Sequence, residues 1–155
     1  MSAASADELR VVEISTADTH ALRRAVLRNG DPARSVDFPE DDLPGTFHLG
    51  VRDGADRIVA TSSWVPRPSA EFPDASAVQL RGMATDASMQ GTGVGGLLIE
   101  AGVERCASAG FDLMWARARD SALAFYAKHA CRVVGEGFVD ATTELPHHIV
   151  VRDLS

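Results

Sequence analysis

The chain has 155 residues, which is enough for one domain that buries a hydrophobic core. Its hydrophobic content of 45% and charged content of 24% are ordinary for a soluble globular protein. The net charge of −7 argues against nucleic acid as a partner, because that binding depends on cationic contacts with phosphate. Apolar runs are too short to span a bilayer, and residues 6–10 interrupt the only apolar stretch near the start. We therefore expect no membrane partner and no signal peptide.

The two cysteines, Cys106 and Cys131, provide neither a disulfide framework nor the spacing of a metal site. Free thiols are the state expected in the cytoplasm. We therefore expect a cytoplasmic protein without a metal, folded as a single domain over residues 1–155.

The chain begins with an apolar pattern that predicts a strand at 9–14 and a helix at 17–28. Asn29 and Gly30 supply the signal for the end of that helix. Residues 31–45 are polar and contain three prolines, which predicts a loop or a broken short helix.

A hairpin and a further strand follow in the middle of the chain. The strands 47–52 and 58–65 flank the turn residues 53–56. Residues 66–74 hold three more prolines and predict an exposed connection, after which residues 78–84 form a strand.

The last third alternates helices and strands. A helix is expected from Val94 to a stop at Gly110, then a short buried strand at 113–116 and a helix at 121–129. Two final strands are expected to pair antiparallel, at 132–139 and 148–151. The order predicts a mixed α/β (α+β) sheet flanked by helices.

Four of the 13 glycines fall within six residues, in Gln90-Gly91-Thr92-Gly93-Val94-Gly95-Gly96, where a helix should begin. Ser, Thr, Asp or Asn normally suffices at a helix start. A glycine cluster instead indicates that φ turns positive or that a ligand approaches the backbone closely. The unpaired N–H groups and the macrodipole of a helix start favour an anion. We interpret this segment, the glycine loop (residues 90–96), as a phosphate-binding site.

Two common phosphate motifs do not fit. Gly91, Gly93 and Gly96 satisfy G-x-G-x-x-G, but the preceding strand ends about six residues too early for a dinucleotide fold. Asp112 stands before the next apolar run, whereas the ribose-binding acid should follow it. A P-loop needs a lysine after its glycines, and the only lysine in the chain is Lys128.

A strand, a short loop and Gln-Gly-x-Gly-Val-Gly at a helix start resemble motif A of the GNAT superfamily of N-acetyltransferases, which binds the pyrophosphate of acetyl-CoA. Residues 80–86 are similar to the family's fourth strand, residues 125–129 to its Phe-Tyr-x-Lys segment, and residues 133–136 to its sixth strand. The similarity covers residues 77–137. It implies a mixed, largely antiparallel sheet of about six to seven strands, about four helices, and acetyl-CoA as cosubstrate.

The resemblance assigns cofactor contacts to two backbone segments and one further residue. The fourth strand would pair with the pantetheine arm, the glycine loop would bind the pyrophosphate, and a serine after the fifth strand would contribute. The cofactor-binding residues are therefore expected to be Met83, Ala84, Thr85, Gln90, Gly91, Thr92, Gly93, Val94, Gly95, Gly96 and Ser121.

Tyr126 is the only tyrosine, and the resemblance places it beside the CoA sulfur. Acetyl transfer expels a thiolate, and a positioned acid that protonates it speeds collapse of the tetrahedral intermediate. A phenol is neutral at physiological pH and can donate that proton. Tyr126 is therefore the expected catalytic acid; the alternative is a tyrosine that only packs its ring in the core.

The general base is left open by the sequence. Many family members use a glutamate on the fourth or fifth strand, but residues 78–84 contain no acid. The candidates are His147, His148, Asp120 or a water, and Glu40-Asp41-Asp42, which we expect to be a solvated loop.

Two positions depart from the family pattern. Arg117 stands where relatives often carry asparagine, and it either reaches a CoA or substrate oxygen or faces solvent. Cys131 follows Ala130 where relatives have Gly-Phe, and an acetyl-carrying role for its thiol is disfavoured because no activating pair is evident.

Taken with the resemblance, these residues predict an acetyl-CoA-dependent N-acetyltransferase in which a primary amine, on a small molecule or a peptide, attacks directly in a ternary complex. A homodimer is also expected. The alternative is a catalytically silent CoA-binding sensor or regulatory module, which the missing base keeps open.

Overall fold

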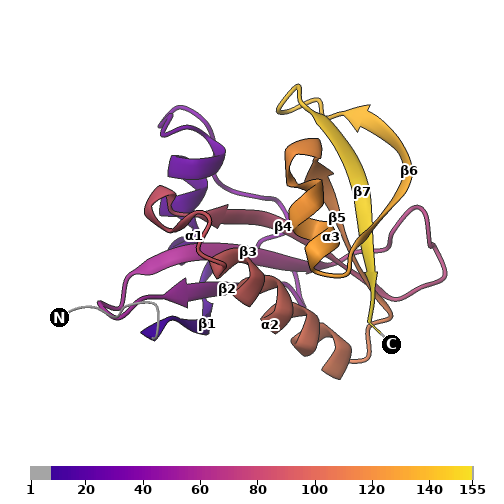
Figure 1. The fold of residues 1–155 in the computed structure, drawn as a ribbon, viewed down its shortest axis with the longest axis horizontal. Helices are drawn as coiled ribbons and strands as arrows, with labels where there is room; N and C mark the ends of the chain where they lie inside the picture. The colour runs from indigo at the N-terminus through magenta and orange to yellow at the C-terminus, as the bar shows by residue number, and fades with distance from the viewer. Residues whose placement is uncertain (1–7, 155) are drawn as a thin grey trace. The chain divides into compact units, whose positions relative to one another are not determined.

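The computed structural model describes residues 8–154, and these gather into two compact units. The first contains the described residues through Val65 together with Gly82–Gly102, and the second contains Pro66–Arg81 and the chain from Val103 onward. Residues 1–7, on which the expectation of no signal peptide partly rests, lie outside the described part. Figure 1 labels the elements of both units.

The first unit contains a hairpin and a strand added to its edge. β1 (Arg10–Ile14) pairs antiparallel with β2 (Phe47–Arg52), which pairs antiparallel with β3 (Ile58–Pro66). The turn between β2 and β3 is held by the carboxylate of Asp53, which accepts hydrogen bonds from the backbone of Ala55 and Arg57. The predicted hairpin is therefore confirmed.

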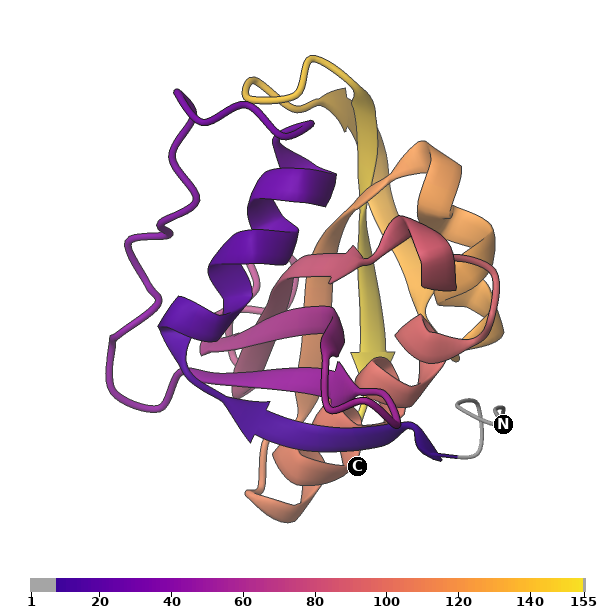
Figure 2. The same cartoon turned by 90° about the vertical axis from the view of Figure 1, so that its left-hand side faces the viewer.

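The predicted first helix is present but changes its winding. α1 (Thr16–Leu22) begins after Ser15, whose side chain and that of Asp18 form a capping box. It continues as a π-helical segment, η2 (Arg23–Leu27), before the chain turns through positive φ at Asn29 and Gly30. Figure 2 shows the connection that follows returning alongside the helix toward β2.

β4 (Ala77–Thr85) starts in the second unit and ends in the first. A 3₁₀ turn, η3 (Ala87–Met89), leads to the glycine loop and then to α2 (Val94–Ser108). The buried face of α2 requires glycine at 102, because an added Cβ would lie 1.9 Å from Cζ2 of Trp64 on β3.

In the second unit, β4 pairs in parallel with β5 (Leu113–Arg119), which pairs antiparallel with β7 (Pro146–Asp153), and β7 pairs antiparallel with β6 (Arg132–Val139). η4 (Asp120–Ala122) and α3 (Leu123–Lys128) connect β5 to β6.

The predicted strands 113–116 and 148–151 were too short, because polar and charged residues at their ends continue the β5–β7 ladder from Leu113–Asp153 to Arg119–His147. The predicted helix 121–129 starts instead as the 3₁₀ turn η4 and is α-helical only from Leu123.

The strand order is β1-β2-β3-β4-β5-β7-β6, a mixed seven-stranded sheet. The expected α/β class and strand number are confirmed. The described chain has three α-helices where about four were expected, and residues 31–45 form no helix. Among residues 8–154, no helix is both long and apolar enough to cross a membrane.

Candidate active site

The glycine loop has the backbone geometry that its composition predicts. Gly91 and Gly93 adopt φ of +81° and +89°, in the left-handed region that L side chains rarely occupy. A Cβ added at either position would meet nothing within 4 Å. The loop therefore combines a glycine-dependent backbone with open space above it.

The first turn of α2 presents free donors beside that space. Its first helical hydrogen bond runs from the N–H of Leu97 to the carbonyl of Gly93, at 3.3 Å. Within the described residues, the N–H groups of Val94, Gly95 and Gly96 have no acceptor, and no acidic residue lies in the first turn. These donors and the positive end of the helix dipole suit an anion.

The end of β4 offers backbone rather than side-chain chemistry. The β4–β5 ladder extends from Ala77–Leu113 to Gln79–Trp115, whereas β4 itself continues to Thr85. Within the continuation Ala84 is buried, while Met83 and Thr85 are half-buried.

Gly82 interrupts β4 with a φ of +65°, and a Cβ there would lie 2.7 Å from the ring of Phe38. This position, which the sequence analysis did not single out, is a glycine because the Phe38 ring occupies the side-chain space. The loop that carries Phe38 is thereby packed against β4 inside the first unit.

Tyr126 lies on α3 in the second unit and is buried. Its ring meets the ring of Phe125 edge to face, with centroids 5.3 Å apart. Burial, with a smaller contribution from the nearby Cys131, raises the pKa of Tyr126 to about 12. The phenol is therefore a neutral proton donor at physiological pH. Ser121, in η4, is exposed.

The two histidine candidates for the general base differ in burial and in their partners. His147 is buried, its ring stacks on Phe138 at 5.8 Å, and its Nδ1 lies 2.9 Å from the carbonyl oxygen of Leu145. His148 is partly exposed, and its Nδ1 lies 2.6 Å from Oδ1 of Asp120. Two of the candidate bases thus form a pair, and the third has a packing role.

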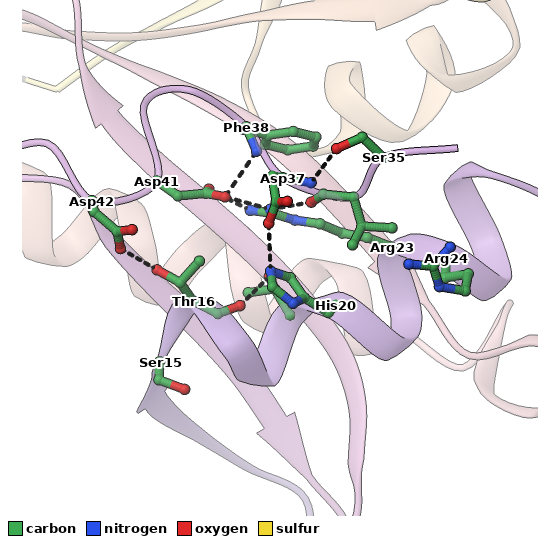
Figure 3. Close-up of polar contacts among 12 residues, drawn as sticks. Ser15, Thr16, His20, Arg23, Arg24, Ser35, Asp37, Phe38, Asp41 and Asp42 are labelled. Atoms are coloured by element: carbon green, nitrogen blue, oxygen red, sulfur yellow. Dashed lines mark hydrogen bonds and ion pairs between the residues drawn. The ribbon is translucent and has the colours of Figure 1, made fainter. Parts of the chain in front are cut away.

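The expectation that Glu40-Asp41-Asp42 is a solvated loop was wrong for two of its three residues. Glu40 and Asp41 are buried, and only Asp42 is exposed. Asp41 is buried because it pairs with Arg23, which is 1% exposed and reaches Asp41 with both terminal nitrogens at 2.8 Å (Figure 3).

Arg23 is bound on several sides. It also donates to the carbonyl of Val36 and to the hydroxyl of Ser63, both at 2.8 Å, and its guanidinium lies 3.7 Å from the centroid of the Phe38 ring. Burial alone would raise the pKa of Asp41, but hydrogen bonds from Arg23 and from the backbone of Phe38, with the Arg23 charge, hold it below 3.8.

The network continues to the start of α1. His48 lies 2.7 Å from the hydroxyl of Ser63 through Nδ1 and 3.1 Å from the hydroxyl of Thr16 through Nε2. Thr16 donates to the carboxylate of Asp42 at 2.8 Å. The sequence carried one signal for this network, since Arg23 stands among the apolar residues of the first helix.

The two departures from the family pattern have structural partners. Arg117 pairs with Asp140 at 3.1 Å and lies over the ring of Phe138, 4.6 Å from its centroid. Cys131 is buried, with its Sγ 3.6 Å from the carbonyl oxygen of His129. No group of three or more potential metal ligands occurs among residues 8–154.

Comparisons with known proteins agree with this arrangement. The family model described as the acetyltransferase (GNAT) family matches residues 15–130. An uncharacterised N-acetyltransferase of Bacillus subtilis strain 168, YitI, is 34% identical over 131 residues, which is 84% of this chain and 87% of that protein.

Solved structures share the fold. The crystal structure of Escherichia coli ElaA superimposes with a TM-score of 0.73 at 19% identity, covering 93% of this chain and 99% of that one. An aminoglycoside 6′-N-acetyltransferase complexed with coenzyme A gives 0.75 at 13% identity, covering 94% and 97%. The solved structures show only a shared fold, but the family model matches most of the chain, and YitI is similar in sequence over most of its length. This chain therefore belongs to the GNAT family and is an N-acetyltransferase.

Proposed function

We propose that this N-acetyltransferase uses acetyl-CoA and transfers its acetyl group to a primary amine by direct attack in a ternary complex. The observation that carries the proposal is the glycine loop. Gly91 and Gly93 have positive φ with open space above them, and three free N–H groups follow at the start of α2. A pyrophosphate has the charge and the acceptor oxygens that such donors require.

The remaining cofactor contacts are proposed on chemistry and family resemblance. The backbone of Met83, Ala84 and Thr85 would bind the pantetheine arm, supported by the continuation of β4 past its ladder with β5. Ser121 is proposed as a further polar contact. That the related aminoglycoside acetyltransferase structure contains coenzyme A supports the choice of cosubstrate.

Tyr126 is proposed as the acid that protonates the departing thiolate. Its raised pKa keeps the phenol protonated at physiological pH, so a proton is available when the thiolate leaves. The acceptor class, a small-molecule or peptide amine, is supported by the net charge of −7, which suits an ammonium group.

Gly93 and Gly110, which flank the two ends of α2, give a matched pair of test variants. Gly93 and Gly110 have similar φ, +89° and +92°, and both face open space. Gly93→Val and Gly110→Val should therefore strain the backbone alike, but only Gly93→Val should abolish acetyl-CoA binding. Saturating acetyl-CoA at about 100 times Kd should stabilise the wild type by about 2.7 kcal/mol, or roughly 5–10 °C in Tm.

A panel of primary amines, with thiol release as the readout, then separates an enzyme from a CoA sensor. Acetyl-CoA binding without turnover on any amine would support the sensor, and equal acetyl-CoA binding by Gly93→Val and Gly110→Val would refute the phosphate site. The proposed homodimer and cytoplasmic location are checked by light scattering and by cell fractionation.

A further inference from the structure

His148 and Asp120 form a carboxylate–imidazole pair that the β5–β7 ladder creates. His148 lies opposite Ala118 in the antiparallel register, and Asp120 follows two residues later, where β5 gives way to η4. The two side chains meet at 2.6 Å between Nδ1 and Oδ1. We call this pair the dyad (His148 and Asp120).

The ring of His148 packs against the backbone of β6 at Gly137. A Cβ at Gly137 would lie 2.8 Å from its Cε1 and 2.9 Å from its Nε2, so a side chain at that position would displace the ring from its present place. The β6–β7 register shifts between Val134 and Phe138, which brings Gly137 to that point. The neighbouring His147 lies on the other face of β7, against Phe138, by strand alternation.

The dyad has the arrangement of a general base. A carboxylate at Nδ1 favours the tautomer that carries its hydrogen there, and the lone pair is then on Nε2. Within the described chain, Nε2 has no hydrogen-bond partner, and the side chains of His148 and Asp120 are 26% and 39% exposed. The free nitrogen can therefore accept a proton from a molecule outside the fold.

Other charges on the packed elements face elsewhere. Alternation along β5 puts its arginines on the face opposite His148, where Arg117 pairs with Asp140. Glu136 on β6 is exposed to solvent. Arg152, on the same face of β7, donates to the carbonyl of His129 at 3.1 Å. In the described structure, Asp120 is the charged group that contacts the imidazole of His148.

We propose that His148, oriented by Asp120, is the general base that deprotonates the acceptor ammonium. This rests on the proposed acetyl transfer. Nε2 takes one proton from the ammonium, the amine nitrogen bonds to the acetyl carbonyl carbon, and the carbon–sulfur bond then breaks. The nitrogen loses its second proton to solvent as the amide forms, and the thiolate takes a proton from Tyr126. The phenolate then recovers a proton from solvent, and the imidazolium releases its proton to solvent.

The test compares two histidine variants on an amine that the wild type acetylates. His148→Gln should lower kcat/KM at neutral pH by about 10²-fold, at the low end for general base catalysis. The loss should shrink as the pH rises and free amine becomes abundant. His20→Gln is the matched control. His20 lies on α1, where its Nε2 is 3.3 Å from a carboxylate oxygen of the exposed Asp37 (Figure 3), and the substitution should leave activity unchanged.

Two further readouts distinguish proton transfer from a structural role. Imidazole added to His148→Ala should restore part of kcat/KM, and Asp120→Asn should shift the pH profile while leaving acetyl-CoA affinity unchanged. Absence of transfer by the wild type to any amine would refute the proposed function itself. Wild-type transfer together with a His148→Gln enzyme of unchanged kcat/KM and pH profile, or with no rescue by imidazole, would overturn the dyad's role alone.

Discussion

A charged side chain inside a protein requires compensation, and Arg23 receives it from several groups at once. The carboxylate of Asp41 accepts two bonds, while Val36 and Ser63 accept one each. Such a pair contributes little net stability relative to apolar residues, but loss of one member leaves the other charge buried and unpaired. The pair therefore fixes the 31–46 connection to the helix (Figure 3), and the bond from Arg23 to Ser63 joins the helix to β3.

Asp41→Asn is accordingly expected to destabilise the fold by about 3 kcal/mol, because the Arg23 charge stays buried without its counterion. Asp42→Asn removes a neighbouring carboxylate that is exposed and bonds only Thr16 among the described contacts, so it should cost less than about 1 kcal/mol. Urea unfolding of both variants measures the difference. Equal losses of unfolding free energy in the two variants would mean that the buried Arg23–Asp41 pair contributes no more to stability than the exposed Asp42.

Tyr126→Phe should lower kcat by about 10²-fold and leave acetyl-CoA affinity nearly unchanged, because it removes a proton donor and almost no volume. The loss should appear equally in kcat and kcat/KM, as for an interaction made only in the transition state. It should shrink with an acyl donor whose leaving group needs no protonation. Wild-type kcat, measured where chemistry limits the rate, would assign Tyr126 to packing only.

At the scale of elements, the packing of a helix against a strand can oppose the helix propensity of a residue. Gly102 lies inside α2, where alanine would ordinarily be favoured by about 1 kcal/mol. Trp64 is fully buried against this point, and a Cβ would overlap its ring. The approach of α2 to β3 therefore depends on the missing side chain.

Gly102→Ala should consequently destabilise the protein by about 1–3 kcal/mol, the usual cost of overpacking a core. Ser108→Ala, at the exposed end of the same helix, should stay within about 0.5 kcal/mol of wild type. Thermal and urea unfolding measure both. A stabilised Gly102→Ala variant would show that helix propensity outweighs the Trp64 contact.

The elements that were predictable are those whose signal is local. The hairpin around Asp53, the glycine loop and the stop at Gly110 follow from turn and helix-end chemistry over a few residues. Partnerships between distant residues were not predictable, because Arg23 and Asp41 are 18 positions apart and nothing local distinguishes a buried aspartate from a solvated one. The same holds for His148 and Asp120, which meet only through the β5–β7 register.

For the whole molecule, the titration of aspartates couples stability to pH. Asp41, Asp86 and Asp140 all have pKa values below the ordinary 3.8. For Asp140, burial opposes the shift, while the bond from Arg117 and two backbone N–H groups produce it. A carboxyl whose folded pKa is depressed stabilises the fold above its unfolded pKa, and this contribution is lost as the pH falls through the folded value.

The free energy of unfolding should therefore be flat near neutral pH and fall as the pH drops toward and below 3.8, because the unfolded chain binds more protons there. Asp41→Asn should be less stable than wild type at pH 7 and should lose less on acidification, since one linked carboxyl is gone. Urea unfolding from pH 7 to pH 3 measures both slopes. Parallel curves for the two proteins would mean that the Arg23–Asp41 pair is not coupled to the acid transition, and the remaining aspartates would then have to account for it.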